Sequence, residues 1–357
     1  MHRATTAVLA AAVAIAACTR DVPTENTQSS ARASTTGNPV NTGSKNTYTL
    51  AVIGDTPYGP DKLAELPSLV DLMNSDPKVD IVVHLGDIKA GSNSPCTDEY
   101  FAMVKGIYDG VADPFVYTPG DNEWTDCHVA SKNNGLYTPT ERLVAIRNLF
   151  FPVPGQTLGG RKKQVLTEAD DPQNSAYVEN VMWMESQVVF ATLNVQGSND
   201  DLASWGTPLP ANAANYPTQA QERASRSQAN SAWLVKAFQL ATDNNAAAVV
   251  LAFQADMWDA TASLNGFDPI VIQIGNLAKA FGKPVLLLEG DSHAFRIDHP
   301  FTAASPLFGL HPNTPIAPNV TRAVVEGSAA GRTEYLRITV SPVKGDLFTF
   351  ERVPLHP

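Results

Sequence analysis

Cysteine is scarce in this chain of 357 residues, which has three: Cys18, Cys96 and Cys127. Basic side chains are also few, because 25 lysines and arginines stand against 36 aspartates and glutamates, a formal net charge of −11. Such an acidic surface argues against nucleic acid as the main partner. It also means that an anionic substrate needs cations placed locally in the site.

The N-terminus lacks an apolar run long enough for a comfortable membrane span. After the basic start MHR come 14 largely apolar residues, a pattern typical of a bacterial secretion signal over residues 1–17. The run ends in Ile15-Ala16-Ala17-Cys18, which resembles the lipobox of bacterial lipoproteins. The resemblance implies cleavage before Cys18 and a lipid on that cysteine. An ordinary signal with an unrelated cysteine is the alternative.

We therefore expect an exported chain that is lipid-anchored in the bacterial cell envelope, in the periplasm or at the outer membrane. Residues 18–46 carry almost no large apolar side chains after the cysteine, which predicts a flexible polar tether. The folded domain is then expected over 47–357. Outside the cytoplasm Cys96 and Cys127 are expected to pair. Their disulfide would close a loop of about 30 residues and contribute roughly 3–4 kcal/mol in the chain-entropy model.

Apolar runs alternate with amphipathic segments along the rest of the chain. Buried strands are predicted within 47–55, 79–87, 115–121, 246–256 and 284–293. Helical spacing is found at 61–76, 98–110, 138–150, 219–245 and 268–282. This alternation predicts an α/β fold with largely parallel strands. Residues 175–195 read instead as two antiparallel strands, and three more strand-like runs follow near the C-terminus. We expect two packed mixed sheets flanked by helices.

Gly-Asp pairs occur five times, and four of them follow an apolar strand-like run. These four contain Asp55, Asp87, Asp121 and Asp291. A single such pair is more often a turn than a ligand, and the fifth, at 345–346, reads as a hairpin turn. The carboxyl ends of strands in open α/β sheets line a common crevice, so four carboxylates are expected to converge there. Buried like charges need cations, which predicts a site for one or two divalent metal ions. His293 would add a nitrogen ligand.

The surroundings of these acids resemble a known family. In chain order they read GDTPY, HLGDIK, PGDNEW, FQADMW and EGDSH. This series resembles the calcineurin-like metallophosphoesterases, which include the purple acid phosphatases, over roughly residues 48–300. The resemblance implies hydrolysis of a small phosphate mono- or diester by a metal-bound water, with the metals neutralising the phosphate oxygens.

The site residues implied by the resemblance depart from the family's pattern at several positions. Pro57 stands where a histidine ligand belongs, and Asn122 where a histidine assists the reacting phosphate. The implied metal ligands are Asp55, Asp87, Asp121, Gln254, Asp291 and His293, with Glu123 supporting Asp121. This oxygen-rich set favours Mn²⁺, Mg²⁺ or Ca²⁺ over zinc or iron.

Catalytic roles are implied for Asp87, Asn122 and His293. Lys89 and Asn122 are expected to donate to phosphate oxygens. Tyr58 is expected either to reach the substrate or to lie at the rim of the site, and Asp256 is a possible extra ligand. The polar insertion at 199–219 is either a loop over the site or a surface excursion.

Two other functions stay open. The altered motifs also suit a non-catalytic lipoprotein that keeps the fold and acts by binding. The Gly-Asp-Ser sequence at 290–292 suggests a serine esterase with Ser292 as nucleophile and His299 as base, although this leaves the other Gly-Asp loops without a role.

Overall fold

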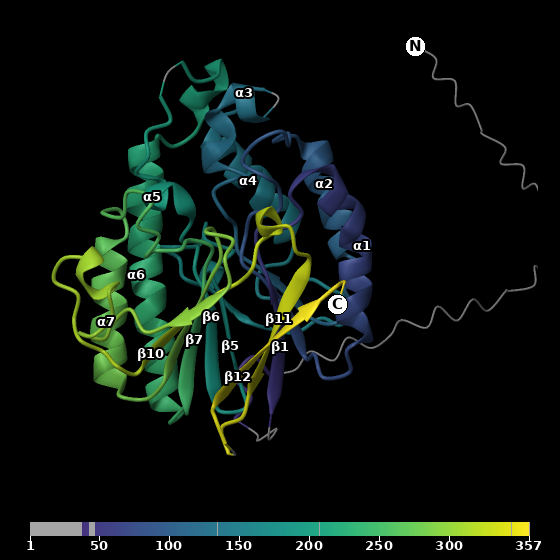
Figure 1. Cartoon of the computed structure of the whole chain (residues 1–357). Coiled ribbons are helices and arrows are strands. Elements are labelled where there is room, and N and C mark those ends of the chain that lie inside the picture. Colours follow the sequence, from purple (N-terminus) through teal and green to yellow (C-terminus); the bar gives the residue numbers. More distant parts are fainter. Residues whose placement is uncertain (1–37, 43–46, 134, 207, 344, 357) are drawn as a thin grey trace, which may run out of the picture. The chain divides into compact units, whose positions relative to one another are not determined.

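The computed structural model describes residues 38–42, 47–133, 135–206, 208–343 and 345–356 (Figure 1). The predicted signal, Cys18 and most of the predicted tether lie outside the described residues. One part of that tether is described. The backbone N–H of Met184 donates to the Pro39 carbonyl at 2.9 Å, and that of Asn41 donates to the Met184 carbonyl at 3.0 Å. Pro39–Asn41 is therefore paired with a strand rather than free linker.

The first sheet has five strands in the order β12-β11-β1-β2-β3. They are β1 (Tyr48–Ile53), β2 (Ile81–His84), β3 (Phe115–Tyr117), β11 (Glu334–Val340) and β12 (Phe348–Pro354). β1, β2 and β3 are parallel, whereas β11 runs antiparallel to both β1 and β12. The carboxyl ends of the three parallel strands therefore lie at one edge.

The second sheet has seven strands in the order β4-β5-β6-β7-β8-β10-β9. They are β4 (Leu166–Thr167), β5 (Val181–Glu185), β6 (Val188–Thr192), β7 (Ala248–Ala252), β8 (Val285–Glu289), β9 (Arg296–Asp298) and β10 (Val320–Val324). β6, β7, β8 and β10 are parallel. β5 and β6 form the antiparallel pair predicted within 175–195.

Helices cover the outer faces of both sheets (Figure 1). The α-helices are α1 (Gly59–Ser75), α2 (Asp98–Tyr108), α3 (Ala130–Asn133), α4 (Pro139–Phe150), α6 (Gln219–Asp243) and α7 (Asp268–Phe281). The short element α5 (Gly197–Asp201) is not right-handed, because Ser198, Asn199 and Asp200 have positive φ. The short 3-10 turns are η1 (Thr125–His128), η2 (Glu168–Asp170), η3 (Ala211–Asn215), η4 (Phe308–Leu310) and η5 (Ser328–Ala330). No helix in this described part is both long and apolar enough to cross a bilayer.

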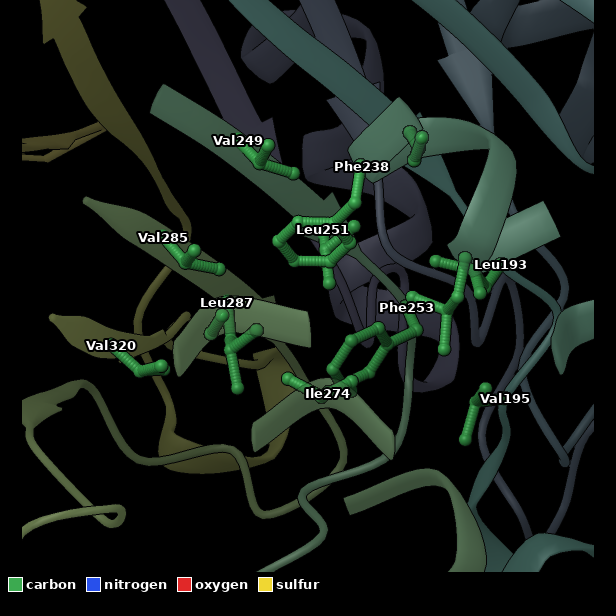
Figure 2. Close-up of a cluster of buried hydrophobic side chains, with 14 of the residues drawn as sticks. Leu193, Val195, Phe238, Val249, Leu251, Phe253, Ile274, Val285, Leu287 and Val320 are labelled. Carbon is green, nitrogen blue, oxygen red and sulfur yellow. The ribbon is translucent and has the colours of Figure 1, made fainter. Parts of the chain in front are cut away.

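Burial on both faces explains why the central strands read as continuous apolar runs. In β7, Val249 and Leu251 pack with Phe238 of α6 and Ile274 of α7, in the cluster drawn in Figure 2. The alternate residues of β7, among them Val250, pack in a second cluster between the two sheets. A third cluster joins the five-stranded sheet to α1, α2 and α4. The predicted α/β fold of two packed mixed sheets flanked by helices is confirmed.

Candidate metal centre

Each predicted Gly-Asp pair follows a strand: β1, β2, β3 and β8 lead into Asp55, Asp87, Asp121 and Asp291. Three of these aspartates turn the chain themselves, with φ of 51° at Asp55, 61° at Asp87 and 66° at Asp291. Aspartate tolerates this left-handed conformation better than most residues. At β8 the glycine before the acid supplies space, because a Cβ on Gly290 would lie 2.5 Å from Asp55 Oδ2.

Asp87, Asp121 and Asp291 converge at the ends of these strands. Each offers a carboxylate oxygen within 4.8 Å of the others. Burial raises the pKa of Asp87 well above its usual range, and the neighbouring carboxylates, first that of Asp121, raise it further. Burial and then the charge of Asp126 raise the pKa of Asp121 to about 8. Three ionised carboxylates at this spacing repel one another, so a cation is needed to keep all three charged.

The donor chemistry of this cluster fits a hard divalent ion. All the ligand atoms are carboxylate oxygens, which Mg²⁺, Mn²⁺ and Ca²⁺ prefer. Within the described ranges no lysine or arginine forms an ion pair with Asp87, Asp121 or Asp291. The lysines and arginines of the described part therefore leave the charge of these three carboxylates unpaired.

Asp55 and His293 lie beside the three-carboxylate cluster and face each other. His293 Nε2 lies 3.3 Å from Asp55 Oδ1. Asp55 is fully buried and accepts a hydrogen bond from the backbone N–H of Asp291 at 2.9 Å. Burial opposes protonation of His293, but the hydrogen bond and charge of Asp55 outweigh it and raise the pKa of the imidazole.

Tyr58 and Asn122 both contact Asp87. The Tyr58 hydroxyl donates to Asp87 Oδ2 at 2.6 Å, and the Asn122 side-chain amide donates to the same oxygen at 2.6 Å. The amide also lies 2.8 Å from the Tyr58 hydroxyl. Tyr58 therefore belongs to the site itself rather than to its rim.

Glu123 joins two of the aspartate-bearing loops. Its Oε1 accepts hydrogen bonds from the backbone N–H of Gly120 at 2.7 Å and from that of Asp87 at 3.1 Å. The Tyr117 hydroxyl also donates to it, at 2.7 Å. The support that was expected for Asp121 thus reaches the second loop as well, through the backbone of Asp87.

The sequence model of the calcineurin-like phosphoesterase family matches residues 48–226, which is half of the chain. The chain belongs to this family. Its matched region contains Asp55, Asp87 and Asp121, whereas Gln254, Asp291 and His293 lie beyond it. No curated protein sequence is significantly similar to the chain.

Among solved structures, GAP50, the anchor in the inner membrane complex of Plasmodium, is similar with a TM-score of 0.45 and 11% identity, over 88% of this chain and 90% of that one. The sulfate thiohydrolase SoxB of Thermus thermophilus is similar with a TM-score of 0.41 and 13% identity, over 81% of this chain and 42% of that one. A 5'-nucleotidase precursor, also from Thermus thermophilus, has a TM-score of 0.34 and 13% identity, over 86% of this chain and 54% of that one. The chain spans about half the length of the last two.

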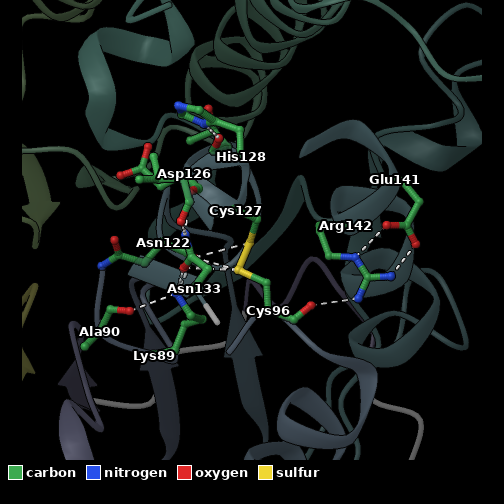
Figure 3. Close-up of a disulfide and its surroundings, with 12 residues drawn as sticks. Lys89, Ala90, Cys96, Asn122, Asp126, Cys127, His128, Asn133, Glu141 and Arg142 are labelled. Carbon is green, nitrogen blue, oxygen red and sulfur yellow. Dashed lines mark hydrogen bonds and ion pairs between the residues drawn. A yellow bond between two sulfur atoms is a disulfide. The ribbon is translucent and has the colours of Figure 1, made fainter. Parts of the chain in front are cut away.

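In this member of the family Lys89 does not face the cluster. Its side chain is fully buried, and Nζ donates to the Ala90 carbonyl at 2.8 Å, the Asn122 carbonyl at 2.9 Å and Asn133 Oδ1 at 2.8 Å (Figure 3). An ammonium has three protons, and all three are used. The prediction that Lys89 binds substrate is therefore wrong, because the amine supports the loop of Asn122 from behind.

The predicted disulfide between Cys96 and Cys127 is confirmed, with the two Cα atoms 5.9 Å apart. Figure 3 shows it beside Lys89 and Asn122. The sulfur atoms lie 3.7 and 3.6 Å from the Asn122 carbonyl oxygen. The bridge ties the segment after Asp87 to the segment after Asp121, as expected.

Gln254 presents its amide nitrogen to the cluster. Nε2 donates to Asp121 Oδ1 at 3.4 Å, while Oε1 accepts from the backbone N–H of Gly197. This corrects the prediction of Gln254 as an oxygen ligand. Asp256 is not an extra ligand either, because its carboxylate forms ion pairs with Arg296 and Arg322.

The serine esterase hypothesis is wrong. Ser292 Oγ is hydrogen-bonded by the Arg296 guanidinium, and His299 Nδ1 lies instead against the Val320 carbonyl at 3.3 Å. Without contact between Ser292 and His299 the serine lacks a general base.

Sequence reasoning missed two residues of the site. Ser198 Oγ lies 2.9 Å from Asp121 Oδ2, so the residue directly before the polar insertion touches the cluster. Arg296 bonds to Asp256 and to the side chain of Ser292, the residue after Asp291. Neither position belongs to a motif. The only signal was the polar segment directly after β6, which concerns Ser198 alone.

Proposed function

We propose that the chain is a metal-dependent phosphoesterase that hydrolyses a small phosphate mono- or diester outside the cytoplasm. The observation that carries this proposal is the convergence of Asp87, Asp121 and Asp291 within 4.8 Å, with no cationic partner among the described residues. Membership of the calcineurin-like phosphoesterase family supports the same reaction class.

Asp87, Asp121 and Asp291 would hold the ion, with Asp55 and His293 beside them. A bound divalent ion would supply positive charge for the phosphate oxygens and lower the pKa of the attacking water. The all-oxygen set favours Mn²⁺, Mg²⁺ or Ca²⁺ over zinc or iron.

The chain's own residues would fix the geometry and handle the proton. Tyr58 and Asn122 orient the Asp87 carboxylate through two hydrogen bonds of 2.6 Å. His293 adjoins the cluster and keeps 29% of its side chain exposed. We assign to His293 the role of general acid, which donates a proton to the leaving oxygen. A general acid must lie close to both the metal site and the leaving group.

Arg296 is our candidate for binding the anionic substrate, in place of Lys89. Its side chain is 38% exposed, and one of its terminal nitrogens is bonded to Ser292 and Asp256. Its Nε is buried and has no hydrogen-bond partner within the described structure, so a phosphate would meet the exposed part of the guanidinium. A partly exposed guanidinium suits a phosphate oxygen, and the acidic chain needs such a local cation.

The test is hydrolysis of p-nitrophenyl phosphate and bis(p-nitrophenyl) phosphate after removal of metal with EDTA and return of Mn²⁺, Mg²⁺, Ca²⁺ or Zn²⁺. We expect metal-dependent turnover that falls at least 100-fold in Asp121→Asn. Metal binding without hydrolysis of either ester would favour the non-catalytic binding lipoprotein. Failure to bind any of the four ions would refute the metal site.

We also propose that Cys18 carries the lipid that anchors the chain in the cell envelope. The secretion-signal pattern and the Cys96–Cys127 disulfide, a bond that persists in oxidising compartments, support this location. Cys18→Ser should release the protein from the membrane fraction into the soluble envelope fraction. Continued membrane association of that variant would contradict the anchor.

A further inference from the structure

A left-handed turn lies at the edge of the carboxylate cluster. Ser198, Asn199, Asp200 and Asp201 have φ of 50°, 60°, 54° and 60°, and none of them is glycine. This conformation costs roughly 1–2 kcal/mol for each L-residue and is normally found at single positions. Four in succession persist only where the surroundings hold them.

Arg226 of α6 holds the centre of the turn. Its side chain is fully buried; Nη1 bonds to Asp200 Oδ1, and Nη2 donates to the Asp200 carbonyl at 3.2 Å. Glu222, one helical turn earlier, pairs with Arg226 Nε at 3.1 Å. The arginine is thus fixed to its own helix and to the turn together.

The end of the turn is held separately. The Trp205 indole N–H donates to Asp201 Oδ1 at 2.7 Å, and the Thr125 hydroxyl bonds to the same oxygen. The Gln219 side-chain amide donates to the Asp201 carbonyl at 2.9 Å. Thr125 lies in η1, directly after the loop of Asp121, so the turn is tied to that loop.

The beginning of the turn touches the candidate metal ligands. A Cβ on Gly197 would lie 2.6 Å from Asp121 Oδ2 and 2.9 Å from Asp291 Oδ2, so the backbone closes against both carboxylates. Ser198 Oγ lies between Asp121 Oδ2, at 2.9 Å, and Asp126 Oδ1, at 2.7 Å. A hydrogen bond from this hydroxyl fixes one oxygen of the Asp121 carboxylate and does not neutralise its charge.

We infer that Ser198 is a positioning residue for Asp121, and that the left-handed turn anchored by Arg226 is the device that places it. The inference rests on the proposed metal site. Strained residues cluster where a fixed geometry is needed, and here the strained turn holds the Ser198 hydroxyl against the Asp121 carboxylate. Groups that orient a ligand in this way typically change metal affinity 10- to 100-fold when removed.

The experiment is calorimetric titration of Mn²⁺ into the metal-free mature chain. Ser198→Ala should raise the Kd for Mn²⁺ 10- to 100-fold with an unchanged near-UV circular dichroism spectrum. Ser204→Ala is the matched control, because among the described residues this exposed serine, six positions after Ser198, bonds only to the backbone N–H of Gly206, and its replacement should leave the Kd unchanged. An unaltered Kd in Ser198→Ala, with Mn²⁺ binding intact in the unmodified chain, would overturn the inference and leave the proposed function standing.

Absence of Mn²⁺ binding in the unmodified chain would remove the metal site, and the inference with it. A second variant, Asp200→Asn, tests the anchor without touching a candidate ligand. Asparagine keeps the left-handed conformation accessible but removes the charge that Arg226 binds. Its Kd for Mn²⁺ should rise in the same direction, and an unchanged Kd in the folded variant would exclude Arg226 as the anchor.

Discussion

The backbone N–H of Gly86 donates to Nδ1 of His84 at 3.0 Å. Nδ1 is therefore an acceptor, and the proton of the neutral ring sits on Nε2, which lies 3.1 Å from the Thr56 carbonyl. The ring is fully buried, and this burial lowers the pKa of His84 to about 4. Because Gly86 precedes Asp87, the neutral imidazole helps to shape a loop of the candidate metal centre.

The first prediction concerns acid stability. The folded chain resists protonation of His84, whereas the unfolded chain takes up the proton near pH 6.5. This contribution to stability is full above pH 6.5 and is lost as the pH falls towards 4. We expect a loss of about 3 kcal/mol in the free energy of unfolding across this window, measured by urea denaturation.

His84→Asn separates this residue from the other acid-sensitive groups. Its side-chain oxygen still accepts from Gly86 but does not titrate, so the variant should lose less stability between pH 6.5 and 4 than the unmodified chain. Parallel losses in the two proteins would show that His84 is not responsible.

The second prediction concerns charge repulsion at Asp121. Its folded-state pKa of about 8 lies above its usual 3.8, so the held proton stabilises the fold at low pH, and that contribution fades as the pH rises towards 8. Asp121→Asn removes the repulsion and keeps partners for Ser198 and Gln254. In EDTA at pH 8 the variant should be more stable than the unmodified chain by about 1–3 kcal/mol.

Addition of Mn²⁺ should offset or reverse this difference in stability. At 100 times its Kd, the ion should stabilise the unmodified chain by about 2.7 kcal/mol and the Asp121→Asn variant hardly at all. Thermal unfolding with and without Mn²⁺ measures both effects. A variant that is destabilised in EDTA, or that gains as much from Mn²⁺, would contradict the converging-carboxylate site.

The third prediction separates structure from substrate binding at Lys89. Lys89→Met leaves the Ala90 and Asn122 carbonyls and Asn133 Oδ1 without their donor. We expect a loss of roughly 2–4 kcal/mol in unfolding free energy, because unsatisfied buried acceptors are costly, and an unchanged KM. Lys105→Met removes an i,i+4 ion pair with the exposed Asp109 at the end of α2; it is the control and should cost under about 0.5 kcal/mol. A raised KM without loss of stability would restore Lys89 to the substrate site.

The fourth prediction assigns that substrate role to Arg296. Arg296→Ala should raise KM for p-nitrophenyl phosphate about 10-fold, since a charge-assisted hydrogen bond to phosphate contributes about 1.5–3 kcal/mol. Stability should change little, because Arg322 still pairs with Asp256. Arg161→Ala is the control. This arginine is exposed and far from Arg296 in the sequence, so its replacement should leave KM unchanged. An unchanged KM in Arg296→Ala would remove the residue from the substrate site.

The fold was predictable because its signals are local. Central strands such as β7 are buried on both faces, and this forces the apolar runs that can be read directly from the sequence. The convergence of the four Gly-Asp loops was predictable for a related reason. A parallel sheet brings the carboxyl ends of its strands together, so a Gly-Asp pair repeated after several strands places the aspartates close to one another.

What failed depends on side-chain direction and on distant partners. Sequence shows that Lys89 is a cation but not that its three protons point inward, away from the cluster. Ser198 follows no motif, because its conformation is set by Arg226, 28 residues further along the chain. Gln254 was assigned by position in a motif, which does not say which end of its amide faces the site.

The last prediction concerns the Cys96–Cys127 disulfide, whose cysteines are 31 residues apart. Cys96→Ser with Cys127→Ser should lower the free energy of unfolding by roughly 3.5 kcal/mol, because the unfolded chain regains the freedom of that loop. Both sulfurs lie against the Asn122 carbonyl, so the double variant should also bind Mn²⁺ more weakly. Urea denaturation and Mn²⁺ titration measure the two effects separately. A loss of stability with an unchanged Kd for Mn²⁺ would mean that Lys89 and Glu123 suffice to hold the two loops.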